Sequence, residues 1–64
     1  MRLQFEYPRA YHDAWSLLSK GSYGMASHGK ELWIEVYSPL DYADEQAIIE
    51  LKRQERAQRK SEGR

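Results

Sequence analysis

The sequence contains no cysteine among its 64 residues, which excludes a disulfide framework and a thiolate metal site and favours a reducing compartment. It also lacks any apolar run near the roughly 20 residues that a membrane-spanning helix needs. Its first residues, 1–6, alternate between apolar and polar side chains instead of forming the apolar block of a secretory signal peptide. We therefore expect a soluble, cytoplasmic protein with no membrane association.

The chain also lacks a net charge, because ten Lys and Arg residues balance ten Asp and Glu residues. The balance hides a division along the chain. Residues 1–51 carry four basic and eight acidic residues, a net charge of −4, whereas residues 52–64 carry six basic and two acidic residues, a net charge of +4. We therefore expect a compact core over residues 1–51 and a basic helical extension over residues 52–64 with a frayed C-terminus. A core this small gains stability from a partner.

The first third of the chain predicts a strand followed by a helix. Apolar side chains alternate with polar ones at Met1, Leu3, Phe5 and Tyr7. Pro8 ends this strand because it has no N–H group, and its fixed φ suits the first turn of a helix. An apolar stripe at helical spacing then follows, made of Tyr11, Ala14, Trp15 and Leu18. We expect a helix over residues 9–20 that stops at Gly21 in a left-handed conformation.

The middle of the chain predicts a β-hairpin. Residues 21–30 contain three glycines and two serines, and they fit either a glycine-rich loop or a short strand over residues 22–27 that turns at His28 and Gly29. The next segment is a clear strand, because β-branched and aromatic residues alternate between two faces. One face holds Leu32, Ile34 and Val36, and the other holds Trp33, Glu35 and Tyr37.

The last helix is expected to open at Ser38 and Pro39, a capping residue followed by a proline suited to the first helical position. Three acidic residues then lie where the helix dipole favours negative charge: Asp41, Asp44 and Glu45. The apolar side chains of this helix end at Leu51, so we expect it to pack against the sheet up to that point and to project beyond it. The predicted fold is a small α+β domain of order β-α-β-β-α, with a three-stranded, mainly antiparallel sheet packed by two helices.

The candidate catalytic residues do not form a convincing site. His12 and His28 lie 16 positions apart, and a metal site needs at least three converging ligands. Ser16, His12 and Asp13 share one helical turn, where they do not point at one another as a nucleophile, base and orienting group must. The glycine cluster at residues 21–24 lacks the Lys-Ser/Thr of a P-loop and is followed by no helix. We expect no enzymatic activity, no cofactor and no metal.

Two aromatic residues, Trp33 and Tyr37, are candidates for partner binding. They share one strand face with Glu31 and Glu35. If both helices cover the other face of the sheet, the two aromatic side chains are exposed, and if the helices straddle the sheet, both are buried. Exposed aromatic residues beside carboxylates suit a protein partner better than a nucleic acid, whose phosphates the carboxylates would repel.

The basic end of the last helix has a preferred side. At about 100° per residue, the six cations of residues 52–64 fill an arc of roughly 140° that points away from the core. Two residues of the first half of the helix fall on the same arc. The resulting outward stripe comprises Tyr42, Ile49, Arg53, Arg56 and Lys60. It is either an ordinary solvated helix end or a docking stripe for an acidic partner.

Two functions fit these patterns. The first is a small non-enzymatic regulator, of the inhibitor or adaptor type, that binds a larger protein or a second copy of itself through Trp33, Tyr37 and the outward stripe. The alternative is weak, non-specific nucleic-acid binding by the basic helix, against which stand the acidic core and a pI near 6.7. In size and in its content of Arg, Glu and aromatic residues, the chain resembles small reading frames of bacteriophages and mobile elements, a likeness that no motif carries.

Overall fold

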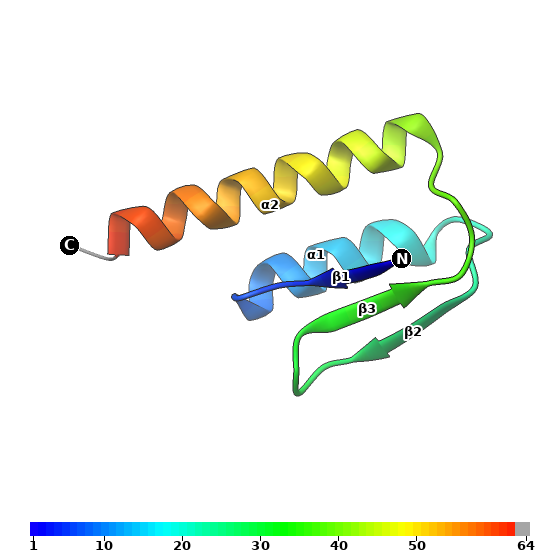
Figure 1. Cartoon of the computed structure of the whole chain (residues 1–64), viewed down its shortest axis with the longest axis horizontal. Helices are drawn as coiled ribbons and strands as arrows, with labels where there is room; N and C mark the ends of the chain where they lie inside the picture. Colours follow the sequence, from blue (N-terminus) through cyan, green and yellow to red (C-terminus); the bar gives the residue numbers. More distant parts are fainter. Residues whose placement is uncertain (63–64) are drawn as a thin grey trace.

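The computed structural model describes residues 1–62, whose elements follow the order strand, helix, strand, strand, helix (Figure 1). The elements are strand β1 (Arg2–Gln4), helix α1 (Pro8–Ser19), strand β2 (Met25–His28), strand β3 (Trp33–Val36) and helix α2 (Tyr42–Glu62). The strands form one sheet of order β1-β3-β2, and both pairings are antiparallel. The predicted α+β class and element order are confirmed.

Strand β3 is the centre of the sheet and pairs with both other strands. Ile34 lies opposite Leu3 of β1 on one side and opposite Ser27 of β2 on the other. The pairing with β1 extends past the strand ends, because Met1 and Val36 exchange main-chain hydrogen bonds of 2.8 and 2.7 Å. The predicted hairpin between β2 and β3 is therefore present, and β1 is added to its far side.

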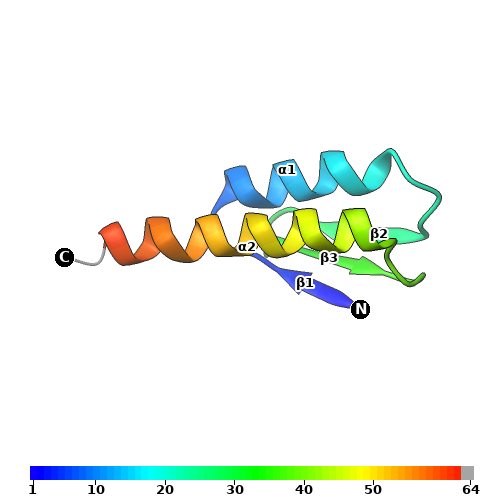
Figure 2. The ribbon, with the colours of Figure 1, turned by 90° about the horizontal axis from the view of Figure 1, so that it is seen from above.

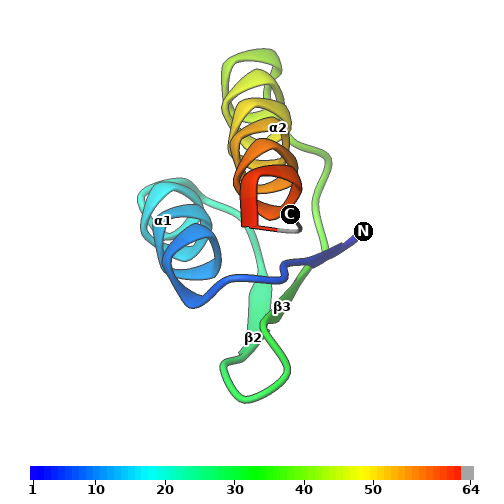
Figure 3. The same cartoon turned by 90° about the vertical axis from the view of Figure 1, so that its left-hand side faces the viewer.

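Both helices lie on the same side of the sheet, next to each other (Figures 2 and 3). The core between the two layers consists of Phe5, Ala14, Leu18, Ile34, Val36 and Ile48, all buried. The helices do not straddle the sheet, so its other face is left uncovered. Within residues 1–62, neither helix is long and apolar enough to cross a membrane.

Helix α1 begins and ends within one residue of its predicted bounds, but the reason for its end differs. Pro8 occupies the start of the helix, as its fixed φ predicts. Gly21 does not adopt the expected left-handed conformation, since no glycine of the described residues has a positive φ. A glycine is needed there for space: a Cβ on Gly21 would lie 2.7 Å from the ring of Tyr23. Close packing, and not backbone freedom, explains this glycine.

Helix α2 begins later than predicted. The expected start at Ser38 and Pro39 is wrong, since the helix starts at Tyr42 and its first helical hydrogen bond runs from Glu45 N–H to Asp41 O at 2.8 Å. Tyr37 still belongs to the sheet edge, because its N–H donates to Gly24 O at 2.8 Å. The residues between the last sheet contact and the helix are therefore used to cross from one layer to the other.

The turn of the hairpin spans residues 29–32, not only His28 and Gly29. Glu31 N–H donates to His28 O at 3.0 Å, and Leu32 then adopts a φ of 57°. This left-handed conformation is uncommon for a leucine. The side chain of Leu32 packs against the core, and its carbonyl oxygen accepts a bond from Phe5 N–H at 2.8 Å. Packing and sheet pairing therefore hold the residue in a conformation that its own preference opposes.

Candidate interaction surfaces

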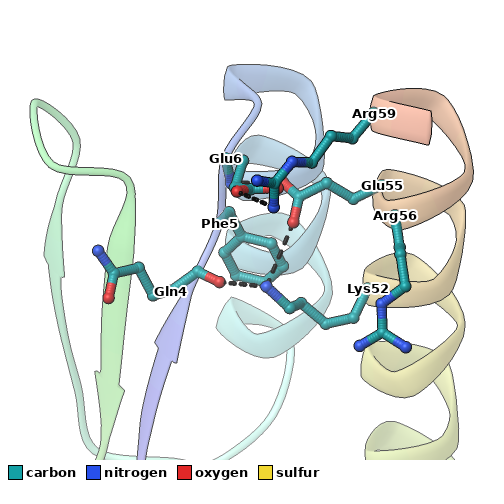
Figure 4. A pocket seen from close by; sticks show the side chains of 7 residues that line it. All are labelled: Gln4, Phe5, Glu6, Lys52, Glu55, Arg56 and Arg59. Carbon is teal, nitrogen blue, oxygen red and sulfur yellow. Dashed lines mark hydrogen bonds and ion pairs between the residues drawn. The ribbon is translucent and has the colours of Figure 1, made fainter. Parts of the chain in front are cut away.

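A hollow of about 370 Å³ lies between α2 and the segment that joins β1 to α1 (Figure 4). Its walls are formed by Gln4, Phe5, Glu6, Lys52, Glu55, Arg56 and Arg59. Figure 4 shows the side chains of Lys52, Glu55 and Arg59 reaching from α2 across the gap, whereas Arg56 stays beside the helix. The bonds that these side chains make decide whether the hollow is a binding site or a joint between two elements.

Glu55 is the buried charge of this hollow, with a side chain only 2% exposed. Its Oε2 atom accepts hydrogen bonds from the N–H groups of Glu6 at 2.6 Å and Tyr7 at 2.8 Å, and its Oε1 atom accepts one from Lys52 Nζ at 3.2 Å. Three donors compensate the buried carboxylate, one of them cationic. Because the residues that donate these N–H groups immediately precede α1, Glu55 ties the middle of α2 to the beginning of α1.

Two cations of the basic helix close the same joint. Lys52 Nζ donates to the main-chain oxygen of Gln4 and lies 5.0 Å from the centre of the Phe5 ring. Arg59 Nη1 donates to Glu6 Oε1 at 2.8 Å. The expectation that all the cations beyond Leu51 point away from the core is therefore wrong for Lys52 and Arg59.

Lys52 and Arg59 contact the rest of the chain because of the way α2 is rotated about its own axis. Its buried side contains Ile48 and Glu55, whereas Ala43, an apolar residue in the first turn of the helix, is exposed. The contacts of α2 with the rest of the chain consequently continue past Leu51 to Glu55 and Arg59. Most charged groups of the hollow are engaged with one another or with the main chain, which favours a structural joint over a ligand site.

The uncovered face of the sheet carries a three-layer stack centred on Trp33. The Arg2 guanidinium of β1 lies 4.1 Å from the centre of the indole ring, and the His28 ring of β2 stacks on the indole with a centroid distance of 3.9 Å and an angle of 19°. The indole N–H donates to Glu31 Oε2 at 3.2 Å. These neighbours leave Trp33 half-buried, and the cation–π contact with Arg2 stabilises the position of its ring.

Tyr37 lies on the same sheet face but is far more open. Its side chain is 66% exposed. The ring lies over Gly24, where an added Cβ would be 3.4 Å from its Cδ2 atom. Of the two aromatic residues proposed for this face, Tyr37 is exposed, whereas Trp33 is mostly covered by residues of the same chain.

The outward stripe of α2 lies in solvent along its whole length. Tyr42 is 77% and Ile49 43% exposed, and the three cations are exposed as well. Arg53 is 3.7 Å from Glu50, one turn away, and neither Arg56 nor Lys60 makes an ion pair within residues 1–62. Two apolar side chains and three cations are therefore exposed along α2, and one of these cations, Arg56, also lines the hollow.

The seven predicted site residues fall on two separate surfaces. Trp33 and Tyr37 lie on the sheet face away from the helices, whereas the five stripe residues are exposed on α2, with Arg56 also lining the hollow. The helix layer and the sheet separate the two surfaces (Figure 3). The two groups of residues therefore lie on different layers of the fold, one on the sheet and one on the helices.

Sequence patterns alone missed three residues that shape these surfaces. Glu55 was placed with the projecting part of the helix, and the only signal for its role is an acid within a basic run. Local patterns do not indicate the stacking of Arg2 and His28 on Trp33, because it depends on the register of three strands. Such contacts become visible only when strands distant in sequence are aligned.

Tyr23 connects the loop after α1 to the beginning of α2. Its hydroxyl accepts a bond from Asp41 N–H at 3.0 Å and donates one to Asp44 Oδ2 at 2.7 Å. The bond from Asp41 lowers the pKa of Tyr23, but the bond to the Asp44 carboxylate, partial desolvation and the two negative charges raise it by more. The net pKa of Tyr23 therefore lies above its ordinary value of 10.0.

The structure does not bring the two histidines together. His12 is exposed on α1, and His28 belongs to the stack on the other side of the sheet. In the part of the chain that the structure describes, no group of three or more His, Asp or Glu side chains is placed to hold a metal ion. Comparisons of the chain with models of protein families, with curated proteins and with solved structures found no match.

Proposed function

We propose that this chain is a small non-enzymatic regulator, of the inhibitor or adaptor type, that binds an acidic partner protein through the outward stripe of α2. The observation that carries the proposal is the combination of exposed Tyr42 and Ile49 with three outward cations on one helix side. Aromatic residues and arginine are preferred anchors in protein interfaces, and a helix face is a common docking element. The absence of cysteine supports action in a reducing compartment such as the cytoplasm.

The uncovered sheet face is the weaker candidate for the same function. Trp33 is engaged by Arg2 and His28, so a partner would have to displace contacts already made. Tyr37 is available, but it lies at the end of the sheet and not on the helix that carries the stripe. We therefore assign the primary contact to the helix and a secondary contact to Tyr37.

The test is an affinity capture from a nuclease-treated bacterial lysate with two matched triple variants. The first variant, Arg53→Gln with Arg56→Gln and Lys60→Gln, removes the cations of the stripe. The control variant removes three exposed cations elsewhere, by Arg9→Gln, Lys20→Gln and Lys30→Gln. We expect the wild-type chain and the control to retain a stoichiometric protein band and the stripe variant to lose it. Equal retention or equal loss in both variants would contradict the assignment to the stripe.

Substitution of the two apolar stripe residues, Tyr42 and Ile49, distinguishes protein binding from a second candidate function, nucleic-acid binding. The outward cations also support weak, non-specific nucleic-acid binding, but Lys52 and Arg59 are engaged within the chain and Arg64 lies outside the described residues. The three outward cations within residues 1–62 would contribute about −3 to the slope of log affinity against log salt. A Tyr42→Ala, Ile49→Ala double variant is expected to lose the protein band. If the variant instead keeps an interaction that nuclease abolishes, the nucleic-acid function is correct.

A further inference from the structure

Strand β2 is an edge strand whose outer side is open. Its pairing with β3 places Ala26 opposite Glu35 and His28 opposite Trp33, and Tyr37 N–H donates to Gly24 O. Since hydrogen-bonding direction alternates along an antiparallel strand, the main-chain groups of Met25 and Ser27 point away from β3. Within residues 1–62, no other segment lies beyond β2 on this side (Figures 1 and 3).

The two edges of the sheet are protected to different degrees. On β1, the main-chain oxygen of Gln4 is occupied by Lys52 Nζ, and Arg2 adds a charge to the strand. Strand β2 contains neither a lysine nor a proline, the residues that most often block pairing with another chain at an edge. Met25 and Ser27 of β2 each have one outward N–H donor and one outward C=O acceptor. An antiparallel copy of the same strand offers the matching acceptors and donors to both residues.

We propose that β2 pairs with β2 of a second copy of this chain, antiparallel and centred on Ala26. In this register Met25 of each copy lies opposite Ser27 of the other, so the outward N–H and C=O groups of both residues form four main-chain hydrogen bonds. Ala26 lies opposite Ala26 of the second copy, at a non-hydrogen-bonded position. The Cα atoms of such a pair are about 4.5 Å apart, so a small side chain fits best. Two three-stranded sheets become one of six strands with a two-fold axis.

Side chains on both faces of the sheet favour the same register. On the helix side, Trp15 is 41% exposed and its Nε1 donates to Ser27 Oγ at 3.1 Å. Pairing brings Met25 of the second copy beside this indole, a favourable sulfur–aromatic contact. On the uncovered side, His28 comes opposite Gly24 of the second copy, over which Tyr37 lies. The stack of Arg2, Trp33 and His28 then continues into the neighbouring subunit. The stripe of α2 takes no part, so this proposal is independent of the proposed function.

Molecular mass in solution tests the pairing. Sedimentation equilibrium of the wild-type chain is expected to show conversion from a 7.6 kDa monomer to a species of twice that mass as concentration rises. Ser27→Pro removes the outward N–H without touching the ladder to β3, and we expect it to weaken dimerisation by about tenfold or more, the effect of at least one lost hydrogen bond. Ser27→Ala loses the same hydroxyl but keeps the N–H group, so it should dimerise far better than the proline variant. A wild-type monomer at every concentration would overturn the proposal.

A single cysteine checks the register without relying on a proline variant that has to fold. The chain contains no cysteine, so Ala26→Cys introduces the only thiol. A Cα separation of about 4.5 Å lies at the short end of disulfide geometry, and we expect rapid formation of a cross-linked dimer under mild oxidation. Lys30→Cys, on the exposed hairpin turn, is the control and should cross-link slowly. Equal rates for the two variants would rule out the register centred on Ala26.

Discussion

At the scale of single residues, the buried Glu55 carboxylate links the middle of α2 to the residues that precede α1. Its three donors come from the start of α1 and from Lys52, and its side chain is almost fully buried. Removing it would leave the N–H groups of Glu6 and Tyr7 without their acceptor. Such a loss costs more than the hydrogen bonds themselves, because buried donors stay desolvated in the folded state.

We therefore predict that Glu55→Ala lowers the free energy of unfolding by about 2–4 kcal/mol, the range for hydrogen bonds to a buried charged group. Glu55→Gln keeps an accepting oxygen and should cost less. Urea unfolding followed by circular dichroism measures both changes. Glu50→Gln, an exposed carboxylate on the same helix, is the control and should change stability by less than about 0.5 kcal/mol. An equal effect at positions 50 and 55 would contradict the role given to Glu55.

Gly21 supports a second prediction at this scale. A Cβ there would lie 2.7 and 2.9 Å from two ring carbons of Tyr23, closer than side chains tolerate. We expect Gly21→Ala to displace the Tyr23 ring and to lower stability by about 1–3 kcal/mol, as overpacking does. Gly29→Ala is the matched control, because its Cβ would be at an ordinary 3.6 Å from Tyr11 and its φ is not positive. Thermal unfolding of the two variants measures the difference. Similar melting temperatures would show that the Tyr23 ring moves aside at no cost in stability.

The residues also show what local patterns can predict. Pro8 marks the start of α1 and the alternation from Leu32 to Tyr37 marks β3, since both features depend on neighbours in the chain. The start of α2 could not be predicted, because Tyr23 fixes it through Asp41 and Asp44, which lie 18 and 21 positions away. On local evidence Ser38 and Pro39 are an equally good beginning.

The candidate surfaces divide in the same way. The side of α2 that carries Tyr42 and Ile49 follows from helical spacing, and both side chains are exposed as expected. The engagement of Lys52 and Arg59 could not be predicted, because their partners lie in the first six residues of the chain. Helical spacing tells which residues share a side of a helix, but not how the helix is rotated on its neighbour.

At the scale of elements, the hydrogen bonds of Tyr23 join the loop between α1 and β2 to the start of α2, and they make the stability of the fold sensitive to alkaline pH. A pKa above 10.0 in the folded chain means that the folded state favours the neutral phenol. This contribution is fully present below the pKa of the unfolded tyrosine and is lost as pH rises through the folded pKa. We predict that stability falls between about pH 9 and pH 11 and falls less in Tyr23→Phe. Urea unfolding across this range measures it, and identical slopes in both proteins would exclude Tyr23 as the cause.

The part of helix α2 that stabilises the fold extends beyond Leu51, where its apolar pattern ends. A chain that ends at Leu51 loses Lys52 and Glu55, and with them the joint to α1. We predict that this truncation lowers the melting temperature by about 10–20 °C, the equivalent of about 3 kcal/mol in a domain of this size. A chain that ends at Lys60 should melt like the full chain. If both truncated chains melt alike, the joint contributes little, and the core does end at Leu51.

At the scale of the whole molecule, α2 makes the shape elongated. Its 21 residues span about 32 Å, and the molecule measures 40 × 25 × 17 Å. Tertiary bonds hold the helix as far as Arg59. We predict that amide hydrogens near Ile48 and Glu55 exchange slowly, whereas those of Lys60 and Ser61 exchange at rates close to an unfolded chain. Hydrogen exchange followed by NMR resolves these positions, and uniform protection along α2 would contradict a helix whose last tertiary bond is that of Arg59.

The strand order has a consequence for how this chain is made. Both β1 and β2 pair only with β3, the last strand to be synthesised, so no strand before Trp33 has a partner while the ribosome is still producing it. During that interval Leu3 and Phe5 remain without the sheet, and α1 has no second layer on which to pack. The arrival of β3 pairs both edges together, and the emergence of Glu55 then locks the first residues against α2. The core of the nascent chain can therefore be completed only late in synthesis, and until then the apolar side chains of its N-terminal segment lack the contacts that cover them in the folded chain.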